Sequence, residues 1–186
     1  MHRSYYTREM GCDESEITDG FEVVYHHLCC VYYGLYCWFL AYICGLKRFA
    51  MYPAEMVQPM RDELTAVGFD ELADASAVDA ALAKEGTTLV VVNSVCGCAA
   101  ANARPGVIMS LSNEKNPDNL TTVFAGVDRE ATNAARKQMV PFPPSSPSIA
   151  LFKDGELVHM LERHHIEGRP AKVIAENLIE AYNTHC

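Results

Sequence analysis

The chain has 186 residues and a formal net charge of −9 at pH 7. This length suits one domain with a hydrophobic core and some additional sequence, and it is short for two full domains. The negative charge argues against a nucleic-acid partner and against a surface that binds anionic lipid.

Residues 1–50 differ in composition from the rest of the chain. Five of the eight cysteines and seven of the nine tyrosines lie in this part. We therefore expect a non-homologous N-terminal extension over residues 1–50 and a folded domain over residues 51–186, with Met51 as the candidate first residue of the folded unit.

A stretch inside the extension, residues 23–46, carries no Asp, Glu, Lys or Arg and is long enough to span a bilayer. Two interpretations stay open. The stretch is a membrane anchor, and Lys47 and Arg48 then leave the domain in the cytoplasm. Alternatively, the extension is disordered or spurious sequence without a function. A disulfide framework is disfavoured, because no secretory signal precedes the five cysteines.

Two helices are predicted at the start of the folded domain. Residues 54–69 space their apolar side chains three or four apart and end at Gly68, although Pro59 lies within the segment. Residues 74–86 form a shorter helix, with Asp74 or Ser76 as its N-cap and Gly86 as its stop.

Strands and helices then alternate. Residues 87–95 are almost uniformly apolar and β-branched, which is typical of a central strand covered on both faces. A helix over 98–115 follows, which Pro105 and Gly106 must kink or interrupt. Next come a strand over 119–128, a helix over 129–139 capped by Asp128, a hairpin over 148–161 and a closing helix over 169–186. This order predicts an α/β fold: a four-stranded mixed sheet, its first two strands parallel, with helices on both faces.

The candidate site is the sequence Cys96-Gly97-Cys98, where the buried strand ends and a helix begins. Free N–H groups and the positive end of the helix dipole favour a thiolate there, so Cys96 is the candidate nucleophile. Cys98 is close enough to resolve a mixed disulfide at Cys96. The small ring of a C-x-C bridge should be strained and exchange readily, and Gly97 can take the backbone angles that such a ring needs.

Other interpretations of the two cysteines stay open. They can be small buried hydrophobic residues, or half of a metal site. A metal needs about four ligands, and the remaining candidates are His159, His164, His165, His185 and Cys186. Strand alternation would send His164 and His165 to opposite faces, so no metal site is predicted. Cys186 is a third redox partner or a frayed terminus, and Arg104 either supports a thiolate or pairs with a carboxylate.

The loop before the hairpin holds the second candidate element. Four prolines fall within residues 140–148, and Pro147 stands directly before the strand and after Ser146. A cis bond here would be a selected turn feature that presents the Ser146 backbone to a substrate, whereas a trans turn proline is the alternative.

Long segments of the domain resemble a known family. TTLVVVNSVCGCAAANARPG, TVFAGVDREAT, PSSPSIALFKDGELVHMLERHHIEG and the terminal HC are similar to the bacilliredoxin family, within the thioredoxin superfamily. The resemblance runs from about Met51 to Cys186. One departure is His165, where the family pattern leads us to expect an acidic residue.

The resemblance implies a thioredoxin-like fold in which Pro147 is a cis-proline that faces the cysteines. It implies a cytoplasmic thiol–disulfide oxidoreductase that removes bacillithiol from S-bacillithiolated proteins. In that reaction Cys96 takes the bacillithiol and Cys98 releases it, with bacillithiol as co-substrate and no bound cofactor. The alternative within the same class is a protein disulfide isomerase or general thiol oxidant.

Overall fold

The computed structural model describes residues 52–186. The predicted extension over residues 1–50, with its candidate membrane segment at 23–46, lies outside the described residues. Within residues 52–186, no helix combines the length and the apolar character that crossing a bilayer requires.

Five strands form one sheet in the order β1-β3-β2-β4-β5. Strands β1, β3 and β2 run parallel, and β4 and β5 are antiparallel. The strands are β1 (Asp70–Glu71), β2 (Thr87–Asn93), β3 (Asn119–Phe124), β4 (Ser148–Lys153) and β5 (Glu156–Leu161). The mixed α/β sheet is confirmed, but the predicted count of four was wrong by one. The additional strand, β1, has two exposed acidic residues and therefore no hydrophobic pattern to reveal it.

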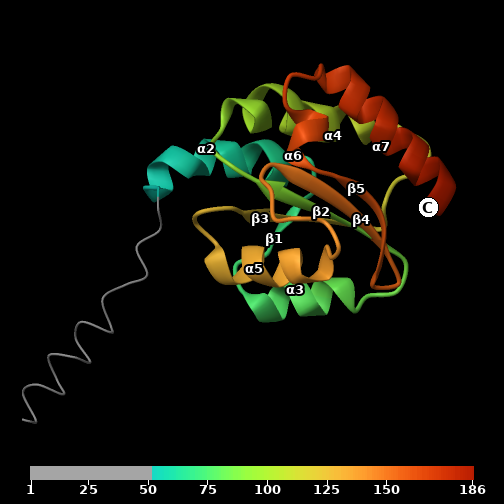
Figure 1. Ribbon diagram of the computed structural model, residues 1–186, viewed down its shortest axis with the longest axis horizontal. Helices are drawn as coiled ribbons and strands as arrows, with labels where there is room; N and C mark the ends of the chain where they lie inside the picture. Colours follow the sequence, from blue (N-terminus) through green and yellow to red (C-terminus); the bar gives the residue numbers. More distant parts are fainter. Residues whose placement is uncertain (1–51) are drawn as a thin grey trace, which may run out of the picture. The chain divides into compact units, whose positions relative to one another are not determined.

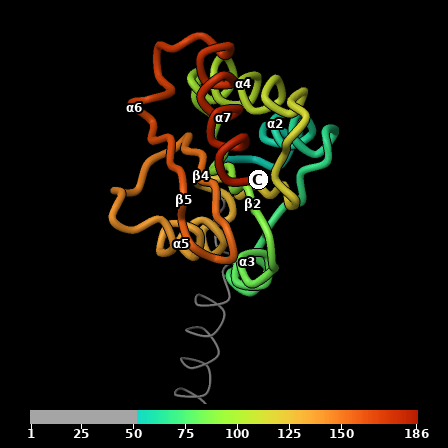
Figure 2. Tube along the Cα trace, turned by 90° about the vertical axis from the view of Figure 1, so that its right-hand side faces the viewer, coloured from blue at the N-terminus to red at the C-terminus, as the bar shows by residue number. Residues whose placement is uncertain are grey.

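Helices cover both faces of the sheet, as Figures 1 and 2 show. Helices α3 and α5 pack on one face, and α2, α4 and α7 lie on the other. The helices are α2 (Ala54–Thr65), α3 (Ala75–Leu82), the π-helix η1 (Ala99–Ala103), α4 (Arg104–Ser110), α5 (Arg129–Gln138), α6 (Arg163–Ile166) and α7 (Ala171–His185).

The central strand β2 explains why its sequence is apolar throughout. Leu89 and Val91 belong to the core beneath α4 and α7, whereas Val90 and Val92 belong to the core beneath α3 and α5. Successive side chains of a strand point to opposite faces, so a strand covered on both faces needs apolar residues at every position. Each such side chain contributes about 1.5–3 kcal/mol when it is fully buried.

The proline after the candidate site changes the helix in a specific way. The Arg104 N–H bonds to the Ala99 carbonyl, five residues back, and the α-helical pattern resumes at Arg104. Pro105 therefore stands in the first turn of α4, where its missing N–H costs little. Gly106 has a different role, because a Cβ there would come within 2.8 Å of the Ile174 side chain. It lets α4 and α7 approach closely.

Two local predictions had different outcomes. The hairpin between β4 and β5 is confirmed, and Asp154 and Gly155 both have positive φ, 51° and 82°, as a two-residue turn of the primed type requires. Asp128 occupies the N-cap position of α5, as predicted, but its side chain makes no capping hydrogen bond. Its carboxylate accepts from the N–H of Phe124 and from Arg61 instead of from α5.

Candidate active site

Cys96 stands where β2 gives way to a helix. The Cys96 carbonyl accepts the first helical hydrogen bonds, from the N–H groups of Ala99 at 3.0 Å and Ala100 at 3.2 Å. The N–H groups in the first turn of a helix have no carbonyl partner within the helix, so they point toward the residues just before it. The sulfur of Cys96 is therefore held against the positive end of the helix.

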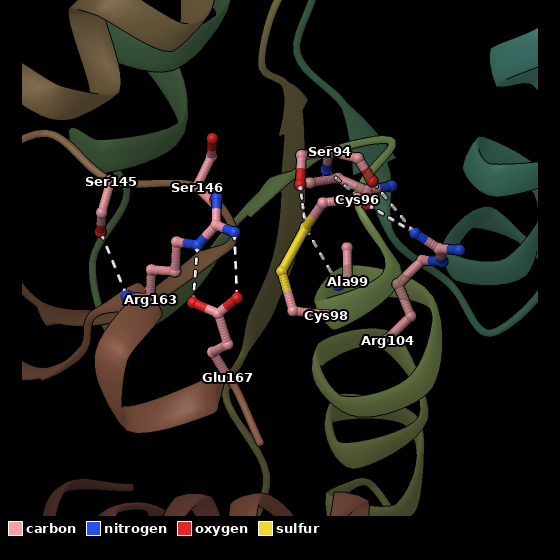
Figure 3. Close-up of a disulfide and its surroundings, with 10 residues drawn as sticks. Ser94, Cys96, Cys98, Ala99, Arg104, Ser145, Ser146, Arg163 and Glu167 are labelled. Atoms are coloured by element: carbon pink, nitrogen blue, oxygen red, sulfur yellow. Dashed lines mark hydrogen bonds and ion pairs between the residues drawn. A yellow bond between two sulfur atoms is a disulfide. The ribbon is translucent and has the colours of Figure 1, made fainter. Parts of the chain in front are cut away.

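Cys96 and Cys98 are joined by a disulfide, shown in Figure 3. The Cys96 Sγ lies 3.3 Å from Ser94 Oγ and 3.4 Å from the Ala99 nitrogen, which donates to it. Cys96 is partly exposed, whereas Cys98 is 9% exposed and packs in the interior. Cys96 is therefore the more accessible of the two sulfurs, and both hydrogen-bonding groups are placed to stabilise negative charge on it.

Gly97, between the two cysteines, is exposed, and a Cβ built on it would have nothing within 4 Å. Its φ is not in the positive range in which glycine is favoured. The expected reason for this glycine, backbone freedom for a tight ring, therefore has no support in its conformation. A side chain at this position would project into open space.

Arg104 holds the turn in front of Cys96. Its guanidinium is 2% exposed and binds Glu63 of α2 through two hydrogen bonds, at 2.7 and 3.2 Å. One of its nitrogens also donates to Asn93 Oδ1 and to the Ser94 carbonyl. Of the two roles considered, pairing with a carboxylate is the observed one. The pair ties the end of β2 to α2 and fixes the backbone that precedes Cys96.

The second element is the loop before β4. The Ser146–Pro147 peptide bond is cis, and Pro147 is buried. Ser148 pairs with Val92 near the end of β2, and this register brings the loop beside the turn that holds Cys96.

Two arginines hold this loop. Arg136 of α5 donates to the Ser145 carbonyl at 3.3 Å, and Arg163 of α6 donates to the Ser146 carbonyl at 3.4 Å. Arg163 also forms a two-bond ion pair with Glu167. This pair raises the pKa of Arg163 and lowers that of Glu167, through hydrogen bonding and then charge. Burial lowers the pKa of Arg136, because desolvation penalises the charged form.

A pocket of about 300 Å³ joins the two elements. Cys96 and Ser146 both line it, whereas Gly97, Cys98 and Pro147 do not. The complete lining is Tyr52, Ser94, Val95, Cys96, Ala125, Gly126, Arg136, Ser146 and Arg163. It includes two arginines and no carboxylate. Figure 3 shows Arg163 and Ser146 across from the disulfide.

The histidines after β5 do not continue the strand, so the predicted placement on opposite faces was wrong. His164 and His165 lie in α6 with ring centroids 3.8 Å apart. The His165 Nδ1 accepts from the Glu162 N–H and so caps α6, a bond that an acidic side chain at this position would also make. Within residues 52–186, the one group of three metal-ligand side chains is Glu162, His164 and His165, which includes neither Cys96 nor Cys98.

Cys186 is a free, exposed thiol at the other end of the sheet. The carbonyl of the preceding residue, His185, accepts from Lys153, and Lys153 pairs with Thr87 at the start of β2. Cys96 follows the far end of this seven-residue strand, about 20 Å away at the usual rise per residue. Cys186 is therefore outside the reach of Cys96.

Fold and site together define a class of protein. A disulfide at the N-terminus of the helix that follows the central strand of a thioredoxin-like sheet, facing a cis-proline loop, is the arrangement of thiol–disulfide oxidoreductases, and this protein is one. Such enzymes act on disulfide-bearing proteins.

Known proteins place the chain more narrowly. The family described as "Disulphide isomerase" matches residues 52–186. A bacilliredoxin from Cytophaga hutchinsonii is 58% identical over 133 residues, which are 72% of this chain and 98% of the relative. A bacilliredoxin from Shouchella clausii is 54% identical over 136 residues, 73% of this chain and 94% of the relative. The chain belongs to the bacilliredoxin family.

Solved structures with a similar fold include oxidised thioredoxin from Plasmodium falciparum. It has a TM-score of 0.45 and 19% sequence identity over 62% of this chain and 98% of the thioredoxin.

Sequence reasoning had missed three of the pocket's polar residues. Ser94 is two positions before Cys96, and its place in the turn was the signal that could have revealed it. Arg136 and Arg163 come from α5 and α6, and no local pattern connects either helix to the cysteines.

Proposed function

We propose that this protein removes bacillithiol from S-bacillithiolated client proteins, with Cys96 as nucleophile and Cys98 as resolving thiol. The observation that carries the assignment is the unequal exposure of the two sulfurs. Cys96 is open to the pocket and contacts Ser94 Oγ and the Ala99 N–H, whereas Cys98 is buried behind it.

The reaction proceeds in two exchanges. The Cys96 thiolate attacks the bacillithiol sulfur of the mixed disulfide, the sulfur–sulfur bond breaks, and the client leaves as a thiolate that takes up a proton. The Cys98 thiolate then attacks the Cys96 sulfur, forms the Cys96–Cys98 disulfide and releases bacillithiol as a thiol. Two electrons pass from the dithiol to the mixed disulfide, and a separate dithiol or small-thiol reductant must return them before the next turnover.

Ser146 and Pro147 serve this reaction by shaping the wall opposite Cys96. The Ser146 carbonyl already accepts a long hydrogen bond from Arg163, which leaves its second lone pair for a thiol-bearing substrate. Gly97 is exposed between the two cysteines and has no side chain, so a client backbone can approach at this position.

We also propose that the enzyme works in the cytoplasm. Support comes from the exposed Cys186, which has no disulfide partner within residues 52–186, together with a site that must be reduced to act. The reducing compartment keeps such thiols free.

Site variants of the full chain test the assignment. Cys96→Ser should abolish client release, whereas Cys98→Ser should release one client and retain the small thiol on Cys96. Peptide mapping by mass spectrometry locates the adduct, and Cys186→Ser is the matched control that should keep full turnover. An adduct on Cys98 in the Cys96→Ser variant would show that the two roles are reversed.

The family description favours a second function, disulfide isomerisation. An isomerase needs one nucleophile and no net transfer of electrons, so it can work without the resolving thiol. Refolding of a scrambled disulfide protein by Cys98→Ser separates the functions. If Cys98→Ser still refolds the scrambled protein but no longer turns over bacillithiol, the protein is an isomerase whose wild-type form also removes bacillithiol.

A further inference from the structure

Arg136 differs from the other shielded arginines of the domain. Arg104 pairs with Glu63, and Arg61 pairs with Asp128 and Glu71. Arg136 has no ion-pair partner within residues 52–186. Its guanidinium donates to one backbone carbonyl, that of Ser145, and its Nε is buried without a hydrogen-bond partner in the described part of the chain.

An uncompensated, partly buried cation is costly. A buried charge loses hydration and regains that free energy only by pairing with a counter-charge or with several hydrogen bonds. A guanidinium also presents its N–H groups in a planar fork that matches a carboxylate. The remaining donors of Arg136 therefore fit an anion that comes from outside the domain.

The location of Arg136 narrows the class of anion. It lines the same pocket as Cys96, together with Arg163, and the lining has no carboxylate although the whole chain has a net charge of −9. Glu167, beyond this lining, already neutralises much of the charge of Arg163. A pocket of about 300 Å³ has the volume of a small molecule and not of a protein segment.

We propose that this pocket binds the small-thiol half of the mixed disulfide and that Arg136 pairs with a carboxylate on it. The inference rests on the proposed function, in which Cys96 attacks the small-thiol sulfur and that half stays bonded to Cys96 after the client leaves. Arg136 is then a specificity residue that favours acidic small thiols, and Arg163 supports it. The exchange itself is unchanged: one sulfur–sulfur bond forms as one breaks, and the client thiolate takes a proton.

The test compares two substrates with the same carbon skeleton, one with two carboxylates and one with two methyl esters in their place. A one-cysteine client peptide is joined by a disulfide to mercaptosuccinate, which carries two carboxylates, or to its neutral dimethyl ester. Peptide release by the reduced full-length protein is measured in a single turnover, with the Cys96→Ser rate subtracted. Each rate is then divided by the rate with dithiothreitol, which corrects for the intrinsic reactivity of the disulfide.

The wild-type protein should prefer the diacid by about tenfold, the worth of one charge-assisted hydrogen-bonded pair. Arg136→Gln should remove most of this preference, measured as the ratio of the diacid rate to the ester rate within the same variant, so that any general loss from the loosened Ser145 loop cancels. Arg136→Lys should keep part of it, because the charge remains and the fork is lost. Arg129→Gln is the matched control: it removes one exposed positive charge from the same helix, outside the pocket, and should keep the full preference.

The outcomes separate the two proposals. A wild-type protein that cleaves both disulfides at equal corrected rates would overturn the carboxylate subsite and leave the proposed function standing. A preference that survives in Arg136→Gln would also overturn it. Failure to cleave either disulfide in a Cys96-dependent way would overturn the proposed function itself. If Arg136→Gln does not fold, the wild-type comparison between the acid and the ester still tests the carboxylate subsite, because equal corrected rates would overturn it.

Discussion

Replacing Ser94 with alanine tests the chemistry assigned to Cys96. The hydroxyl lies 3.3 Å from the Cys96 sulfur, and its removal leaves the Ala99 N–H as the nearest donor. When Cys96 is a thiolate, the serine can only donate, so the lost bond is one made to a charged group. Such bonds contribute about 1.5–3 kcal/mol. Because sulfur is a large, soft acceptor and Cys96 is partly exposed, this hydrogen bond should contribute less than that range, about 1 kcal/mol.

A loss of about 1 kcal/mol lowers the acid dissociation constant of the Cys96 thiol by about fivefold, and the thiolate fraction falls by the same factor wherever the thiol is mostly protonated. The remaining thiolate is more basic and therefore more nucleophilic, which offsets nearly half of the loss on a logarithmic scale. We expect alkylation of Cys96 by iodoacetamide to slow by about two- to threefold at neutral pH. At high pH, where the thiol is fully ionised, the variant should react slightly faster than the parent.

The assay is peptide-mapped alkylation of the Cys98→Ser protein over a range of pH. Ser146→Ala is the matched control, since its hydroxyl belongs to a residue of the same pocket and the described structure has no bond from it to sulfur. Equal alkylation profiles for the parent and Ser94→Ala would refute the argument. So would an equal effect of Ser146→Ala, because the change would then come from pocket polarity in general.

The remaining predictions concern stability. Gly106→Ala places a methyl group within 2.8 Å of the Ile174 side chain, so overpacking should exceed the gain in helix propensity and cost about 1–2 kcal/mol of unfolding free energy in urea. Gly97→Ala is its control in open space and should stay within about 0.5 kcal/mol of the parent; equal losses would contradict the packing argument. Hydrogen bonds from the N–H and then the hydroxyl of Thr87 lower the pKa of Asp118. The Asp118 carboxylate therefore stabilises the folded state above the usual carboxyl pKa range, and this stabilisation is lost as pH falls through the folded pKa. Asp118→Asn should therefore be less stable than the parent at neutral pH, and urea titrations should converge in acid; a gap that persists there would exclude the charge as its cause.

Hydrophobic patterns predicted the sheet well, and the exceptions have identifiable causes. The uniform run in β2 required burial on both faces, and the Asp154–Gly155 pair fixed the hairpin. Strand β1, with two residues, and helix α6, with four, escaped prediction because each is too short for a hydrophobic pattern to repeat within it. Asp128 precedes a helix as an N-cap would, yet Arg61 from α2 draws its carboxylate away.

The sequence by itself determined the candidate cysteine pair and its place. Strand, turn and helix are encoded by neighbouring residues, and so is the position of Cys96 at the junction. Only the tertiary structure decided which sulfur is exposed, that Cys186 is out of reach, and that Ser146, Arg136 and Arg163 line one pocket with Cys96. The physical reason is that burial and charge depend on segments far apart in the chain. The register between β2 and β4, and the packing of α5 and α6 beside them, set these distances, and no local pattern of residues contains them.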